Sequence, residues 1–127
     1  MIMKKILIVL CLFVFVVGCN SEEEINVYKN MTMEQAKTEL DKDKSIILID
    51  VRTLEEYNTG HITGSLSIPV ETIMINNNKL PSDKNAKIFI YCQSGNRSKK
   101  ASEKMVNLGY ENVYNIGGII DWKYETE

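Results

Sequence analysis

Two uninterrupted apolar runs constrain the fold of this chain more than any other feature. Residues 46–49 read Ile-Ile-Leu-Ile, and residues 88–91 read Ile-Phe-Ile-Tyr. Neither run shows the polar alternation of a strand with one face in water, so both favour strands that are buried on both faces. Such strands belong to parallel sheets covered by helices, and the runs therefore predict an α/β domain.

Helical segments alternate with these strands. Two capping boxes, which begin at Thr32 and Thr53, each place a Gln or Glu three residues after the hydroxyl and so mark helix starts. Helices are predicted for residues 33–42, from 54 to 57 or 58, 70–76 and 98–108, and shorter strands for residues 65–68 and 111–115. The alternation indicates a parallel sheet with helices on both faces.

The length and the charge balance limit the size and the partners of the protein. The chain has 127 residues, of which 44% are hydrophobic and 25% charged, and these values fit one globular domain. Its formal net charge is -2. Because binding to a nucleic-acid backbone needs a dominant cationic surface, we expect no nucleic-acid partner.

The first residues have the pattern of an export signal. Lys4 and Lys5 precede an apolar run over residues 6–17, which is shorter than the roughly 20 residues of a membrane-spanning helix. Gly18 and Cys19 follow directly, with the small residue just before the cysteine. This arrangement resembles the lipobox of bacterial lipoproteins.

The lipobox resemblance divides the chain into three parts. It implies a signal peptide over residues 1–18, then a lipidated Cys19 at the start of an acidic tether over residues 19–27, and a domain over residues 28–127. The lipid would hold the domain on the extracytoplasmic face of the cell membrane. An ordinary signal peptide and a short uncleaved anchor are the alternatives.

The positions of the cysteines leave a single free thiol in the predicted mature domain. Of the three cysteines, Cys11 lies in the signal segment and Cys19 is the predicted lipid site, so Cys92 has no partner for an internal disulfide. An unpaired cysteine in an exported protein indicates a reactive thiol. A buried cysteine that acts as a small apolar residue is the alternative.

The residues around Cys92 favour a reactive thiol. Cys92 follows the second apolar run and opens a polar loop over residues 92–98, which has Gly95 at its centre and leads directly into a helix. The amides of such a loop, together with the helix N-terminus, can surround a thiolate and lower the pKa of the thiol. Arg97 adds a planar cation suited to holding a dianionic substrate.

The clearest resemblance to a known family lies in this loop. Its sequence, Cys92-Gln93-Ser94-Gly95-Asn96-Arg97-Ser98, resembles the active-site loop of rhodanese-family sulfurtransferases. The other segments in that family's order and spacing are Ile49-Asp50-Val51-Arg52, Glu56-Tyr57 before Gly60-His61-Ile62-Thr63-Gly64-Ser65, Ile68-Pro69, and Gly117-Gly118-Ile119 with Trp122. The resemblance implies one rhodanese-like domain, with a three-layer α/β fold and a central parallel sheet of about five strands.

The resemblance also implies a two-step transfer of sulfane sulfur without a cofactor. The Cys92 thiolate attacks the outer sulfur of thiosulfate, or of a polysulfide or persulfide donor, and becomes a persulfide. Cyanide or a thiol then accepts that sulfur. The residues implied to bind the donor or the persulfide are Gln93, Ser94, Gly95, Asn96, Arg97 and Ser98.

Loop length and one side chain refine the implied substrate. Four residues separate Cys92 from Arg97, whereas the related dual-specificity phosphatases have five and a wider ring that fits a phosphoryl group. Gln93 is neutral at a position where many family members have a basic residue. The missing charge lowers the affinity expected for thiosulfate.

Three residues outside the loop complete the predicted site. Asp50 and Arg52 are expected to hold the loops beneath the site by hydrogen bonding. His61, the only histidine, is interpreted as a packing and hydrogen-bonding residue rather than a general base. No pair of cysteines or histidines has the spacing of metal ligands, so no metal site is predicted.

Two functions other than catalysis stay open. A non-catalytic module could use the loop to hold an anion or a protein, although binding alone needs no thiol. A persulfide carrier or redox sensor would use the thiol and act with another exported protein.

Overall fold

The computed structural model of the protein describes residues 27–127. The predicted signal peptide over residues 1–18, the predicted lipid site Cys19 and all but the last residue of the predicted tether lie outside the described residues. Within residues 27–127, every helix is too short or too polar to span a bilayer.

Strands and helices alternate along most of the described chain. The strands are β1 (Lys29–Asn30), β2 (Ile47–Asp50), β3 (Leu66–Ser67), β4 (Ile88–Cys92) and β5 (Val113–Gly118). The helices are α1 (Met33–Lys42), α2 (Leu54–Thr59) and α3 (Asn96–Asn107), with 3-10 helices η1 (Val70–Thr72) and η2 (Ile119–Asp121). Both predicted capping boxes form, at Thr32 before α1 and at Thr53 before α2.

All five strands lie parallel in one sheet, in the order β1-β5-β4-β2-β3. The two apolar runs form its centre, where Ile49 of β2 pairs with Ile90 of β4. Every residue of β4 is buried. The predicted parallel sheet of about five strands is confirmed.

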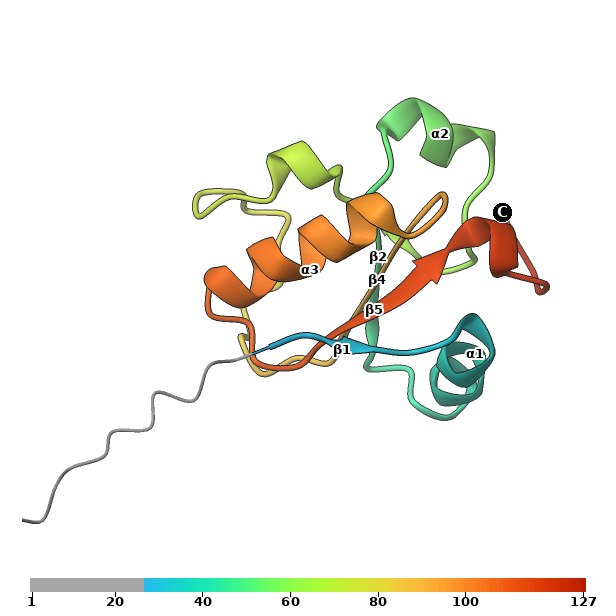
Figure 1. Cartoon of the computed structure of the whole chain (residues 1–127), viewed down its shortest axis with the longest axis horizontal. Coiled ribbons are helices and arrows are strands. Elements are labelled where there is room, and N and C mark those ends of the chain that lie inside the picture. The colour runs from blue at the N-terminus through green and yellow to red at the C-terminus, as the bar shows by residue number, and fades with distance from the viewer. Residues whose placement is uncertain (1–26) are drawn as a thin grey trace, which may run out of the picture.

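Helices cover both faces of this sheet, and Figure 1 shows α1 and α3 on opposite sides of it. Ala101 and Met105 of α3 belong to one buried cluster with Ile90. Ala36 of α1 belongs to another with Phe89. Neighbouring residues of β4 therefore pack against different helices, which is the three-layer arrangement that the sequence predicts.

Two short segments differ from the prediction. Residues 70–76 were expected to form a helix, but only η1 forms, because Asn77 donates from its side-chain amide to the Thr72 carbonyl oxygen at 2.7 Å and closes a turn. β1 was not expected at all. Its two residues are exposed and carry no apolar pattern, and it exists through pairing with β5.

The carboxyl ends of the three central strands meet at one edge of the sheet. Asp50 of β2 pairs with Tyr91 of β4, and Cys92 of β4 pairs with Gly118 of β5. The loops that follow these strands therefore converge. This edge is where open parallel sheets bind their ligands.

Candidate active site

Cys92 is the last residue of β4, and the loop that follows encloses its sulfur. The Gly95 N–H donates a hydrogen bond to Cys92 Sγ at 3.0 Å, and Ser98 Oγ lies 3.5 Å from the same sulfur. Gly95 has a φ of +109°, a left-handed conformation that favours glycine and turns the loop into α3. The loop thus brings an amide and a hydroxyl to the thiol.

The surroundings of Cys92 combine burial with hydrogen-bond donors. Burial, with only 1% of the residue exposed, raises the pKa of the Cys92 thiol. Hydrogen bonds from the Ser98 side chain and from the amides of Ser98, Gly95 and Ser94 act in the opposite direction and outweigh burial. The pKa of Cys92 therefore lies below its ordinary value, which increases the fraction present as the nucleophilic thiolate.

The end of strand β5 packs closely against the loop. A Cβ at Gly118 would lie 2.3 Å from the Gln93 carbonyl oxygen and 2.7 Å from Ser94 Cα, so only glycine fits there. The Ile120 N–H also donates to the Gln93 carbonyl oxygen, at 3.3 Å. In the sequence, Gly118 is recognisable only as part of a family segment, because the residue that it contacts, Gln93, lies far away along the chain.

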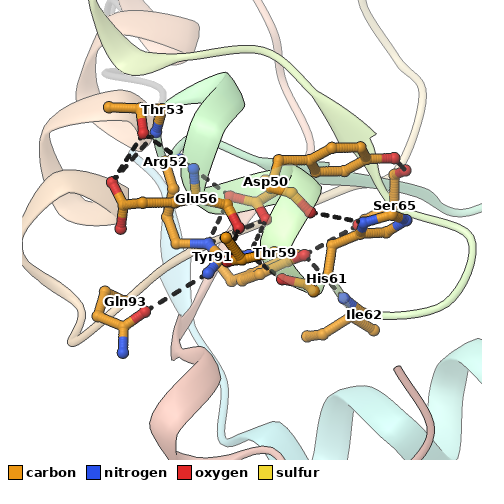
Figure 2. A network of polar contacts seen from close by, with 12 residues as sticks. Asp50, Arg52, Thr53, Glu56, Thr59, His61, Ile62, Ser65, Tyr91 and Gln93 are labelled. Atoms are coloured by element: carbon orange, nitrogen blue, oxygen red, sulfur yellow. Dashed lines mark hydrogen bonds and ion pairs between the residues drawn. The ribbon is translucent and has the colours of Figure 1, made fainter. Parts of the chain in front are cut away.

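Arg52 links the site to two neighbouring loops. Its Nη2 donates to Asp50 Oδ2 and to the Gly60 carbonyl oxygen, both at 2.7 Å, and its Nη1 lies 3.5 Å from Gln93 Oε1. Figure 2 shows Arg52 between Asp50 and Gln93. Asp50 and Arg52 are both buried. The pair therefore fixes the loop around Gly60 relative to the loop after Cys92, and its functional role stays a prediction.

His61 lies in a separate set of contacts. Its ring stacks on that of Tyr57, with centroids 3.7 Å apart, and its Nδ1 lies 2.9 Å from the Tyr57 carbonyl oxygen. Its Nε2 lies 3.6 Å from Glu127 Oε1. Among the described residues, no hydrogen bond joins the His61 side chain to the loop after Cys92. The packing and hydrogen bonding expected of this residue are present.

Arg97 forms an ion pair that the sequence did not reveal. Its Nη1 and Nη2 lie 2.6 and 2.9 Å from the two carboxylate oxygens of Glu56 on α2. The hydrogen bond from Arg97 is the main reason that the pKa of Glu56 falls to about 2. Both side chains are about one-third exposed. The guanidinium predicted to hold a substrate is thus occupied by a carboxylate of the same chain.

The remaining loop residues lie at the rim of the site. Gln93, Ser94 and Asn96 are exposed, whereas Ser98 is fully buried next to the sulfur. Within the described part of the chain, no three His, Cys, Asp or Glu side chains are placed to hold a metal ion. The arrangement is that of a covalent nucleophile surrounded by hydrogen-bond donors.

Comparison with known proteins identifies the family. The model of the Rhodanese-like domain matches residues 32–125. The chain belongs to the rhodanese-like family. A solved rhodanese-like domain protein from Staphylococcus aureus is 35% identical, with a TM-score of 0.66, over 76% of this chain and 93% of that one. The expected family and fold class are confirmed.

Proteins with different functional names share this rhodanese-like domain. The putative sulfur carrier protein YrkF of Bacillus subtilis is 35% identical over 87% of this chain and 59% of its own length. A sulfurtransferase of Allochromatium vinosum is 36% identical over 70% of this chain and 82% of its own. A tRNA uridine(34) hydroxylase of Erwinia tasmaniensis is 41% identical over 63% of this chain but only 24% of its own. This chain therefore spans less than two-thirds of two of these relatives.

Proposed function

We propose that this rhodanese-like protein is a sulfurtransferase that carries sulfane sulfur on Cys92. The observation that supports the proposal is the thiol itself, at the end of β4, where it accepts the Gly95 N–H, lies 3.5 Å from Ser98 Oγ and has a lowered pKa. A thiolate held in this way is activated without a neighbouring base. The sulfurtransferase name of the Allochromatium relative agrees with this chemistry.

The proposed reaction has two displacement steps. In the first, a lone pair of the Cys92 thiolate forms a bond to the outer sulfur of the donor. The donor's sulfur–sulfur bond breaks, and its electron pair leaves with sulfite when the donor is thiosulfate. In the second step, cyanide or a thiol attacks the outer sulfur of the Cys92 persulfide, and the electron pair returns to Cys92 as thiolate.

The loop residues have separate parts in this proposal. The Gly95 N–H, 3.0 Å from Cys92 Sγ, and the Ser98 hydroxyl, 3.5 Å away, stabilise the negative charge on that sulfur before it attacks the donor. Gln93, Ser94 and Asn96 are exposed at the rim, where a donor enters. Asp50 and Arg52 keep the rim in place through Gln93, and His61 packs outside it.

We also propose that the domain is anchored to the extracytoplasmic face of the membrane by lipid on Cys19. The support is the sequence of residues 1–19, with two lysines, a short apolar run and Gly18 before Cys19. The small donor and acceptor, or a partner protein that carries sulfur, would then meet the domain outside the cytoplasm.

The test is the mass of the intact protein after incubation with thiosulfate or polysulfide. We expect a gain of one sulfur atom, its loss on addition of cyanide, and no gain in the Cys92→Ser variant. Absence of the adduct with every donor would contradict the proposal. A non-catalytic binding module would give that result.

A persulfide carrier is the second candidate, and the name of the Bacillus relative favours it. A carrier would accept one sulfur on Cys92 but release it to cyanide or small thiols slowly. Repeated turnover with excess thiosulfate and cyanide, measured as thiocyanate formed per protein, separates a transferase from a carrier.

A further inference from the structure

Both guanidinium groups next to the Cys92 loop are already paired with carboxylates. Arg97 Nη1 and Nη2 lie 2.6 and 2.9 Å from the oxygens of Glu56. Arg52 Nη2 lies 2.7 Å from Asp50 Oδ2, and that pair is buried. Among residues 27–127, Arg97 belongs to this loop and Arg52 contacts it, and neither guanidinium is left free to neutralise an incoming anion.

The other groups at the rim add little positive charge. Gln93 is neutral and exposed. Lys99 and Lys100 are exposed on α3, where water and salt screen their charge. Ile120, whose N–H donates to the Gln93 carbonyl oxygen, has an exposed apolar side chain beside the loop. Such a rim suits a donor with an organic group better than a small dianion.

We infer that Glu56 determines the donor preference of this site by occupying Arg97. The donor class that fits is an organic persulfide, R–S–SH, whose sulfurs carry at most one negative charge, rather than thiosulfate, which carries two. Glu56 thus acts through Arg97 as a positioning residue. This inference rests on the proposed function.

Transfer from a persulfide follows the same displacement at Cys92. The thiolate forms a bond to the outer sulfur of R–S–SH, and the bond between the two donor sulfurs breaks. Its electron pair goes to the inner sulfur as RS⁻, which takes the proton from the outer sulfur. The products are the ionised Cys92 persulfide and the thiol RSH. The step needs no cation to neutralise the leaving group.

The Glu56→Gln variant tests the inference. Glutamine keeps the shape of the side chain and an oxygen that can accept the Thr53 N–H in the capping box, but it removes the charge that holds Arg97. The matched control is Glu55→Gln, which removes a charge from an exposed residue in the same turn of α2. KM and kcat are measured on the full chain, with cyanide as acceptor and either thiosulfate or 2-mercaptoethanol persulfide as donor.

We expect Glu56→Gln to lower KM for thiosulfate by about tenfold, which corresponds to about 1.4 kcal/mol. The kcat value should change little, because thiosulfate keeps its charge from the bound state to the transition state. KM for the persulfide should stay within about twofold of the wild-type value, since its charge is smaller. The Glu55→Gln variant should match the wild-type protein with both donors.

An unchanged or increased KM for thiosulfate in Glu56→Gln would overturn the inference, because it would mean that Glu56 does not compete with the donor for Arg97. Salt provides a second test of the same charge competition. The difference in KM for thiosulfate between Glu56→Gln and the wild-type protein should shrink as salt is added, because salt screens the charges of Arg97, Glu56 and the donor; a difference that does not depend on salt would also refute the inference. Failure of the wild-type protein to accept sulfur from either donor would instead refute the proposed function.

Discussion

Replacement of Ser98 by alanine tests the physical origin of the thiolate. Ser98 is fully buried, and its Oγ lies 3.5 Å from Cys92 Sγ. The Ser98→Ala variant removes a donor to the sulfur while the Gly95 N–H at 3.0 Å remains. Since bulk water does not reach this position, we expect the pKa of Cys92 to rise.

The size of the effect follows from the charge on the sulfur. A hydrogen bond to a charged group contributes about 1.5–3 kcal/mol, and about 1.4 kcal/mol corresponds to a factor of ten. At a pH below the midpoint of ionisation, the variant should therefore contain about tenfold to a hundredfold less thiolate. The fold should survive, because the Gly95 carbonyl oxygen still accepts the Lys99 N–H at 3.2 Å.

The assay is the rate of alkylation of Cys92 by iodoacetamide as a function of pH. The control is Ser102→Ala, since Ser102 is equally buried on α3 but donates to the Ser98 carbonyl oxygen rather than to the sulfur. A pH profile of Ser98→Ala that coincides with those of Ser102→Ala and the wild-type protein would refute this account of the lowered pKa.

Four further variants or conditions test other contacts. Gly118→Ala should displace the Gln93 carbonyl oxygen, because the added Cβ would overlap it. Persulfide formation should slow, as measured by sulfur loading, and the free energy of unfolding in urea should fall by about 1–3 kcal/mol. Unchanged loading would contradict the close contact. Asp50→Asn leaves the buried guanidinium of Arg52 without its counter-charge and should lower the free energy of unfolding in urea by about 3–5 kcal/mol. A decrease below about 1 kcal/mol, the level of an exposed ion pair, would argue against the buried pair. The pKa of Glu56 is lowered from 4.5 to about 2, so its ion pair should stabilise the fold above pH 4.5, and this stabilisation should be lost as the pH falls toward 2. The midpoint of thermal unfolding of Glu56→Gln should therefore approach that of the wild-type protein only in strong acid. Cys19→Ala should abolish incorporation of labelled palmitate in a bacterial host, and retained label would exclude Cys19 as the lipid site.

The sequence predicted the centre of the fold because its signals there are local and strong. The run over residues 88–91 has no polar interruption and became the fully buried strand β4. The hydroxyl and the glutamine of the first capping box sit three residues apart, and both of their hydrogen bonds form. By contrast, β1 depends on its partner strand, and η1 ends where the side chain of Asn77 takes over a backbone acceptor.

The loop around the thiol was predictable because its neighbours in sequence are also neighbours in space, and Asp50 and Arg52 could be added because they follow another strand of the same sheet. Cys92, Gly95 and Ser98 lie in one loop, so the pattern of a strand, a glycine and a helix start was enough to bring them together. The pairing of Arg97 with Glu56 depends on how α2 packs near the start of α3, which no local pattern contains. The sequence identifies Glu56 as part of a helix-capping box, but its ion pair with Arg97 can be recognised only in the folded structure.

The Ser98 hydroxyl has one proton and more than one acceptor within reach. Its oxygen lies 2.9 Å from the Gly95 carbonyl oxygen as well as 3.5 Å from the sulfur. When negative charge appears on the sulfur, the proton turns toward it and the carbonyl loses that interaction. Ionisation of the thiol therefore changes the hydrogen bonding of the Gly95 carbonyl group. The stretching frequency or the ¹³C chemical shift of that carbonyl can report whether the sulfur is charged, without any label on the sulfur itself.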